Sequence, residues 1–402
     1  MTRVPARFVL LPLCALIPLS GIAAENDVSV TLGANHYWDS NFARLHEKPD
    51  SEHYSQFDAT LSVNHSYKSQ QWNLRARASQ LEYDVREEMD ESYYAGSGFW
   101  KSDWADSLRT GILWQRQAYA VDRLEFVEQD IVSRDDWNAY VDIGRLDSLS
   151  LLLGGRHSSK KHSNPKRKSM EFDEDEASAQ ISYHFPGQSR INIRGAYGER
   201  EYLSPRFLSV APDATADAEI ESGNVAALAY APNQFDFDFI RAEVNTEWVL
   251  SPKSRIDFQW AYFERDGLIN EDDGDEISIE YNWDITRKIK TLWGARKAQP
   301  AQGEMNDSPD QIVSLYAQLS WALMRNLTWS FSANKSEYDY LPGNAFAAPT
   351  EKVVSITPVQ LRYAFAKQLT LEFAATYVDR ESLVLIRDFD YTRAHLGLQW
   401  DF

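Results

Sequence analysis

Ile277-Ser278-Ile279-Glu280-Tyr281-Asn282-Trp283 alternates apolar and polar residues without a fault. The same period of two recurs at 72–78, 256–260, 327–333 and 369–373. Successive side chains of a β-strand point to opposite faces, so this alternation indicates strands with one dry face and one wet face. The chain is therefore predicted to be all-β. A soluble β-sandwich gives the same local pattern, so the period alone does not decide the fold.

The lengths of the connections between these strands discriminate between the two folds. Short polar turns are predicted at 68–70, 102–107, 144–147, 186–188, 251–254, 284–288, 324–326 and 366–368. Longer connections alternate with them, at 39–53, 84–91, 119–135, 158–175, 202–238, 265–275, 298–310, 337–349 and 379–388. Short turns at one end and long loops at the other are typical of a transmembrane antiparallel β-barrel, with the turns in the periplasm and the loops outside the cell.

Eight turns and nine loops join eighteen strands, and sixteen strands is the alternative count. One further strand-like segment, 225–231, falls inside the longest connection. It is predicted to be a hairpin or an inward-folded part of that loop, because it does not fit the rhythm of turns and loops.

The composition fits a membrane barrel. The chain holds 13 Trp, 20 Tyr and 19 Phe, although its mean hydropathy is only −0.49. In a barrel half of the strand residues face lipid, half face water, and aromatic residues mark the two interfaces. No later segment reaches the roughly 18 apolar residues of a membrane helix. The formal net charge of −19 argues against nucleic acid as a partner, since duplex binding needs a basic face.

The first residues have the features of a secretory signal peptide. Arg3 and Arg7 precede a twelve-residue apolar run at 8–19, and small residues follow it. Such a run is too short to cross about 30 Å of hydrocarbon as a helix. We therefore expect a signal peptide over 1–24 and one barrel domain over 25–402, in the outer membrane of a Gram-negative bacterium. The only cysteine lies within the expected signal peptide, so thiol chemistry and disulfides are not expected in the mature chain.

The chain closes on Leu396-Gly397-Leu398-Gln399-Trp400-Asp401-Phe402, which again alternates and ends on an aromatic residue. This is the usual last strand of proteins that the outer-membrane assembly machinery inserts, so we expect that machinery to be a partner through Phe402. Outer-membrane lipid and lipopolysaccharide are the other expected partners. A sheet in lipid must close, because an open edge leaves backbone groups unpaired.

If the apolar alternates face lipid, the polar alternates face the lumen. The candidate lumen-lining residues are Arg75, Arg77, Arg109, Arg194, Arg241, Glu243, Asp257, Glu280, Arg296, Arg362, Glu372 and Arg393. Eighteen strands enclose an aqueous channel unless a loop or plug fills it. The charges could orient a polar solute or brace the wall as salt bridges, and their mixed signs argue against a simple ion filter. Loop 202–238 is the candidate constriction, with an ordinary extracellular hairpin as the alternative.

Two loops carry charged residues that could form other sites. The basic and acidic loop 158–175 could bind lipopolysaccharide phosphates or an acidic polysaccharide, or could simply be solvated. Asp272-Asp273-Gly274-Asp275 resembles part of a calcium loop but lacks the full ligand series, so a turn is expected. The chain contains no HExxH, GxSxG or glycine-rich phosphate motif. We therefore expect no catalytic residue, metal or cofactor, and the chain is not expected to be an enzyme.

The first hairpin carries Tyr37-Trp38-Asp39-Ser40-Asn41-Phe42-Ala43-Arg44-Leu45, followed by Ser55-Gln56-Phe57-Asp58. These stretches resemble the outer-membrane β-barrel porin family of exopolysaccharide biosynthesis and export loci, although Trp38 departs from the commoner pattern. The resemblance implies a passive conduit for a secreted exopolysaccharide, with polysaccharide and periplasmic export components as partners. Asp39 and Asn41 are interpreted first as turn residues. The alternatives are a general or substrate-selective diffusion porin, and a plugged structural or adhesive barrel acting through its extracellular loops.

Overall fold

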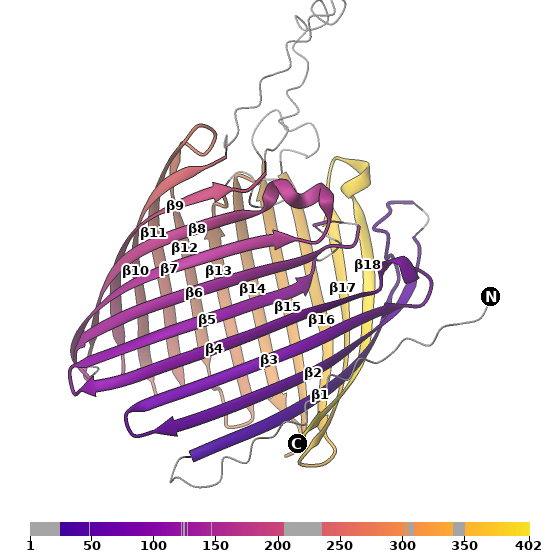
Figure 1. Cartoon of the computed structure of the whole chain (residues 1–402). Coiled ribbons are helices and arrows are strands. Elements are labelled where there is room, and N and C mark those ends of the chain that lie inside the picture. Colours follow the sequence, from indigo (N-terminus) through magenta and orange to yellow (C-terminus); the bar gives the residue numbers. More distant parts are fainter. Residues whose placement is uncertain are drawn as a thin grey trace, which may run out of the picture.

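The computed structural model is a closed antiparallel barrel of eighteen strands (Figure 1). It describes residues 25–47, 49–121, 123, 125–126, 128–145, 147–204, 235–301, 304, 309–340 and 350–402. The first strand pairs with both the second and the last, and this closes the barrel. The predicted count of eighteen strands is confirmed and the alternative of sixteen is wrong. The expected signal peptide and segment 225–231 lie outside the described residues.

Neighbouring strands in the chain are neighbours in the barrel. The first nine are β1 (Glu25–Asp39), β2 (Glu52–Tyr67), β3 (Gln70–Tyr83), β4 (Glu91–Ala105), β5 (Leu108–Ala120), β6 (Ile131–Gly144), β7 (Leu149–His162), β8 (Phe172–His184) and β9 (Arg190–Tyr202). The others are β10 (Phe237–Ser251), β11 (Ser254–Gly267), β12 (Asp272–Trp283), β13 (Ile289–Ala298), β14 (Gln311–Ala322), β15 (Leu327–Asp339), β16 (Thr350–Ala364), β17 (Leu369–Glu381) and β18 (Phe389–Asp401). Short 3-10 helices lie in three loops: η1 (Glu87–Met89), η2 (Pro165–Met170) and η3 (Leu385–Arg387).

The connections alternate in length as the sequence predicts. All eight predicted short turns join consecutive strands at one end of the barrel, and the longer loops lie at the other end (Figure 1). The expected turn at 272–275 is wrong, because these residues begin β12 and pair with β11. Near the loop end, outward positions such as Asp273 and Glu264 are charged, so the apolar–polar contrast that marks a strand fades there.

The outer wall exposes a broad apolar surface. Trp72, Leu74, Trp293 and Leu315 each keep about half of their surface exposed, at 48%, 51%, 56% and 57%. A water-exposed face of this kind would be costly, whereas lipid contact makes it favourable. The barrel is therefore of the outer-membrane type. None of the helical segments in the described part of the chain has the length and apolar character needed to cross a bilayer.

The motif at 37–45 makes side-chain contacts that join the first strand, β1, to the last strand, β18. Asp39, fully buried, accepts hydrogen bonds from Nη1 and Nη2 of Arg44 at 2.8 and 2.9 Å. Arg393 of β18 lies 3.3 Å from the same carboxylate. Asn41 donates a hydrogen bond to the backbone oxygen of Asp390 at 3.0 Å. The residues interpreted as turn formers thus also hold the start of the barrel to its end.

Apolar side chains gather at the loop end of the barrel. Phe42 of the first loop packs with Tyr83, Met89 and Ile131 in one buried cluster. A second cluster contains Phe172, Tyr202, Phe235, Phe237, Phe239 and Ala301. These clusters fix the loops to the strands beside the lumen, and the second lies next to the candidate site.

Candidate functional site

The sequence-predicted lumen residues alternate with the lipid-facing positions of their strands, which puts them on the inner face. Arg75, Arg296 and Arg362 are exposed there. Among the described residues these three arginines form no hydrogen bond or ion pair. They are therefore cations open to a solute, whereas the other predicted residues have protein partners.

Most of the remaining predicted residues brace the wall at scattered positions. The contacts are Arg77 with Asp58 at 2.8 Å, Arg109 with Asp142 at 2.9 Å, Asp257 with Arg255 at 2.9 Å, Glu280 with the Tyr316 hydroxyl at 2.5 Å, Glu372 with Gln360 at 2.8 Å, and Arg393 with Asp39 at 3.3 Å. Five of these contacts join residues on the same strand or on adjacent strands, and the contact between Glu280 on β12 and Tyr316 on β14 passes over β13. These contacts match the bracing role that the sequence left open.

One stretch of the inner wall, over β7–β14, brings four predicted residues together around a cavity of about 470 Å³. Six arginines and five glutamates line it: Arg156, Arg194, Arg200, Arg241, Arg265 and Arg296, with Glu174, Glu176, Glu243, Glu276 and Glu304. Phe237, Phe239 and Phe263 add aromatic surface to the lining. We call this the arginine cavity.

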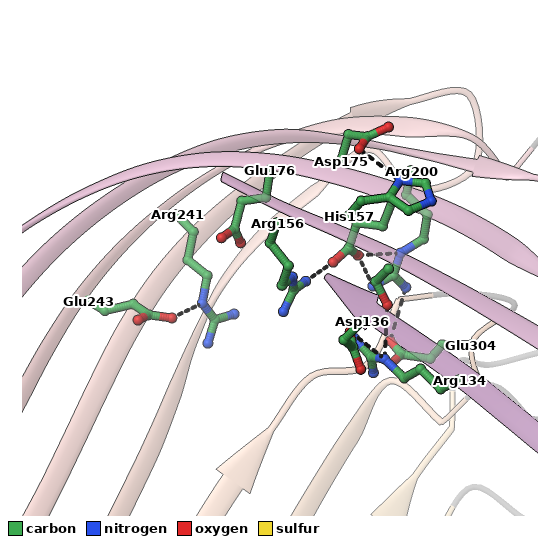
Figure 2. Close-up of polar contacts among 12 residues, drawn as sticks. Arg134, Asp136, Arg156, His157, Asp175, Glu176, Arg200, Arg241, Glu243 and Glu304 are labelled. Atoms are coloured by element: carbon green, nitrogen blue, oxygen red, sulfur yellow. Dashed lines mark hydrogen bonds and ion pairs between the residues drawn. The ribbon is translucent and has the colours of Figure 1, made fainter. Parts of the chain in front are cut away.

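Alternating charges hold most of its side chains in place. Arg194 contacts Glu176 on β8 and lies 3.3 Å from Glu243 on β10. Arg241 contacts Glu243 and reaches Glu276 on β12 at 2.7 Å. Figure 2 shows Arg241 and Glu243 in contact beside Arg156 and Glu176. These ion pairs hold the guanidinium groups of Arg194 and Arg241 in place on the inner wall.

A second chain of contacts continues to the loop after β13. Arg156 and Arg200 both contact Glu174, with Arg200 Nε donating at 2.7 Å. Arg200 also lies 3.3 Å from the Glu304 carboxylate. The Arg200 guanidinium stacks 4.1 Å above the Phe172 ring centre. A planar guanidinium suits this combination of ion pairs and stacking.

The described residues of the 299–310 connection reach across the inside of the barrel. Lys160 on β7 donates from Nζ to the Glu304 backbone oxygen at 2.9 Å. Arg265 on β11 donates to the Gln299 oxygen at 2.6 Å. Six strand spacings separate β7 from β13, or about 29 Å along the wall. Glu304 therefore lies on the inside of the barrel, beside the arginine cavity.

Glu304 is ionised in this setting. Burial opposes ionisation of its carboxyl, but the Arg200 guanidinium and the Lys160 ammonium outweigh burial and lower its pKa. The predicted constriction is loop 202–238. Its residues 205–234 lie outside the residues that the structure describes. Phe235 and Phe237, which flank them, pack in one cluster with Ala301.

Several cavity residues were missing from the predicted set. Glu174 was placed in a predicted loop and Arg265 at the edge of another, although both continue the period of two on strands that are longer than expected. No alternating pattern in the sequence marks Glu304, because it lies on a loop and contacts Arg200 and Lys160, which are on distant strands.

Three residues of the basic run at 160–168 differ from both expectations for its loop, whereas Lys161, Lys166 and Lys168 are exposed as the solvated alternative predicts. His162 and Arg167 are fully buried and share Asp130, at 2.7 and 3.1 Å. Lys160 points to Glu304, as described above. These three side chains are therefore neither solvated nor presented at the cell surface. Within the described ranges, no group of three or more His, Cys, Asp or Glu residues could hold a metal ion.

Comparison with known proteins identifies the fold. No protein-family model and no curated protein sequence matches the chain. Among solved structures, OpdK of Pseudomonas aeruginosa with vanillate has a TM-score of 0.52 at 11% identity, covering 94% of this chain and 99% of that one. OccK2 (OpdF) of the same organism gives 0.56 at 9% identity over 94% and 98%. Its complex with glucuronate gives 0.54 at 10% identity over 94% and 97%.

These similar structures are outer-membrane porins rather than enzymes, and the likeness shows that the chain has their barrel fold. The outer-membrane location agrees with the apolar outer wall. At 9–11% identity these comparisons show the barrel fold and not the transported solute. None of them supports an association with exopolysaccharide loci.

Proposed function

We propose that this protein is a substrate-selective diffusion porin for small organic anions, carboxylates above all. One observation carries the proposal. The arginine cavity holds six guanidinium groups, and Arg296 among them is exposed without a hydrogen bond or ion pair to any described residue. An unpaired guanidinium that projects from a strand can offer a carboxylate two parallel hydrogen bonds.

The size and lining of the cavity suit a small solute. A volume of about 470 Å³ lies within the usual range of small-molecule sites. The phenylalanine rings contact the apolar part of such a solute while the guanidinium groups meet its charge. Mixed signs keep the attraction moderate, which passage requires, since tight binding would stall the solute.

Structural neighbours lend chemical support. OpdK and OccK2 have been crystallised with vanillate and with glucuronate, and both compounds carry one carboxylate. A conduit for a polymer would instead need a wide, continuous bore. The position of Glu304 inside the barrel, in contact with β7 and β9, favours a small solute over a polysaccharide.

The test compares two solutes of nearly equal size in vesicles that contain the purified protein. Glucuronate should enter faster than glucose. Arg296→Gln should slow glucuronate roughly threefold to tenfold, because it removes a charge-assisted contact in a hydrated site, and should leave glucose entry unchanged.

Arg75→Gln is the matched control, since Arg75 is also an inward, exposed arginine without a described partner but lies outside the cavity. Equal entry of both solutes into wild-type vesicles would refute the proposed function. Equal effects of the two substitutions would refute the assignment to the arginine cavity.

A further inference from the structure

Glu304 is a carboxylate held among the cations of the arginine cavity. Its Oε2 lies 3.3 Å from Arg200 Nη1 and accepts a hydrogen bond from the Ala301 backbone N–H at 3.3 Å. Lys160 holds its backbone oxygen at 2.9 Å. The residue thus occupies the kind of position that a solute carboxylate would take.

Its setting differs from that of the four other cavity glutamates. Their side chains are 3%, 6%, 11% and 23% exposed, and all four project from strands: Glu174, Glu176, Glu243 and Glu276. Glu304 is 34% exposed and lies on a connection between strands. Of the five carboxylates it is therefore the one most open to the lumen.

We propose that Glu304 is a specificity-determining residue, a resident carboxylate that limits how strongly the cavity attracts anions. The inference rests on the proposed function, because it concerns the same anion path. With Glu304 ionised, six arginines face five glutamates. Without its charge the excess of positive charge rises, and Arg200 keeps Glu174 but loses the more exposed of its two competing carboxylates.

The test is Glu304→Gln in single channels across a planar bilayer with a KCl gradient. Glutamine is nearly the same size and can still accept from Arg200 and from Ala301. The reversal potential should move toward the chloride equilibrium potential. Added glucuronate should block current at a concentration roughly five- to tenfold lower than in wild type, as Coulomb's law gives for one charge several ångströms away in a partly hydrated site.

Two matched variants separate charge from shape. Glu304→Asp keeps the charge and should keep the selectivity of wild type. Glu247→Gln removes a charge from the inner wall outside the cavity, where Glu247 pairs with Arg190 at 3.0 Å, and should shift the reversal potential less than Glu304→Gln does.

Specific outcomes overturn the inference. A Glu304→Gln channel with higher conductance but an unchanged reversal potential and unchanged block would show that Glu304 only anchors its loop. A failure of the proposed function is distinguishable, because it appears in the wild-type channel as cation preference. In that case Glu304→Gln can still shift the potential toward chloride, which would support its role in selectivity.

Discussion

Replacing Asp39 with alanine should loosen the seam of the barrel. Asp39 has no exposed surface, and the side chain of Arg44 keeps only 1% of its own. The substitution removes both hydrogen bonds that Arg44 makes to the carboxylate and leaves a buried cation. Breaking a buried pair by removing one partner costs about 3–5 kcal/mol.

The lower end of that range applies to Asp39→Ala. Arg44 keeps its contact with the Asn41 backbone oxygen and lies 3.5 Å above the centre of the Tyr391 ring. We therefore expect a loss of about 3 kcal/mol in the free energy of unfolding, or more than a hundredfold in the folding equilibrium.

Urea unfolding in lipid vesicles, followed by tryptophan fluorescence and by mobility on unheated gels, measures this loss. Asp147→Asn is the control. It breaks an exposed pair in which Arg145 and Asp147 are 71% and 67% accessible, so no measurable change is expected. A loss below about 1 kcal/mol for Asp39→Ala would refute the reasoning, because it would mean that Arg44 finds water or other acceptors at the seam.

Two further predictions concern the wall and the outer loops. Gly294→Ala places a Cβ 2.2 Å from the Tyr316 ring, so the ring must move away from Glu280. The variant should lose about 1–3 kcal/mol of its free energy of unfolding in the same assay. A variant as stable as wild type would contradict this close packing. Asp130 fastens the loop that contains η2. Burial opposes its ionisation, but hydrogen bonds from His162 and Asn164 outweigh burial and hold its pKa below the usual 3.8. Because the folded pKa is depressed, this stabilisation is present above the unfolded pKa and is lost as the pH falls through the folded pKa. A spin label attached at Lys168→Cys should therefore gain mobility only below about pH 4. The same label in a protein that also carries Asp130→Asn should already be mobile at neutral pH. Equal mobility of both proteins at all pH values would contradict the role of Asp130.

Strand number and turn positions could be predicted because each follows from local chemistry. A strand such as 277–283 alternates because one face meets lipid and the other meets water, and turns such as 186–188 interrupt that pattern with proline and glycine. The same logic placed Arg194, Arg241, Glu243 and Arg296 on the inner face. It could not show that these four share one cavity, since that depends on the register between strands.

The remaining features depend on contacts between distant parts of the chain. Nothing local in the sequence indicates that Glu304 meets Arg200 and Lys160, which lie on strands β9 and β7. Loop boundaries were also misplaced where charged residues replace apolar ones on the outward face, as at Asp273. The motif at 37–45 was attributed to turn formation, whereas its arginine and aspartate also join the first strand to the last.

The most direct test of the account is the reversal potential of the wild-type channel in a planar bilayer with a KCl gradient. A channel whose arginine cavity combines paired guanidinium groups with the open Arg296 should have a reversal potential shifted toward the chloride equilibrium potential, and glucuronate should reduce its current where glucose does not. A cation-selective channel, or a bilayer that shows no conductance at any voltage, would contradict the account.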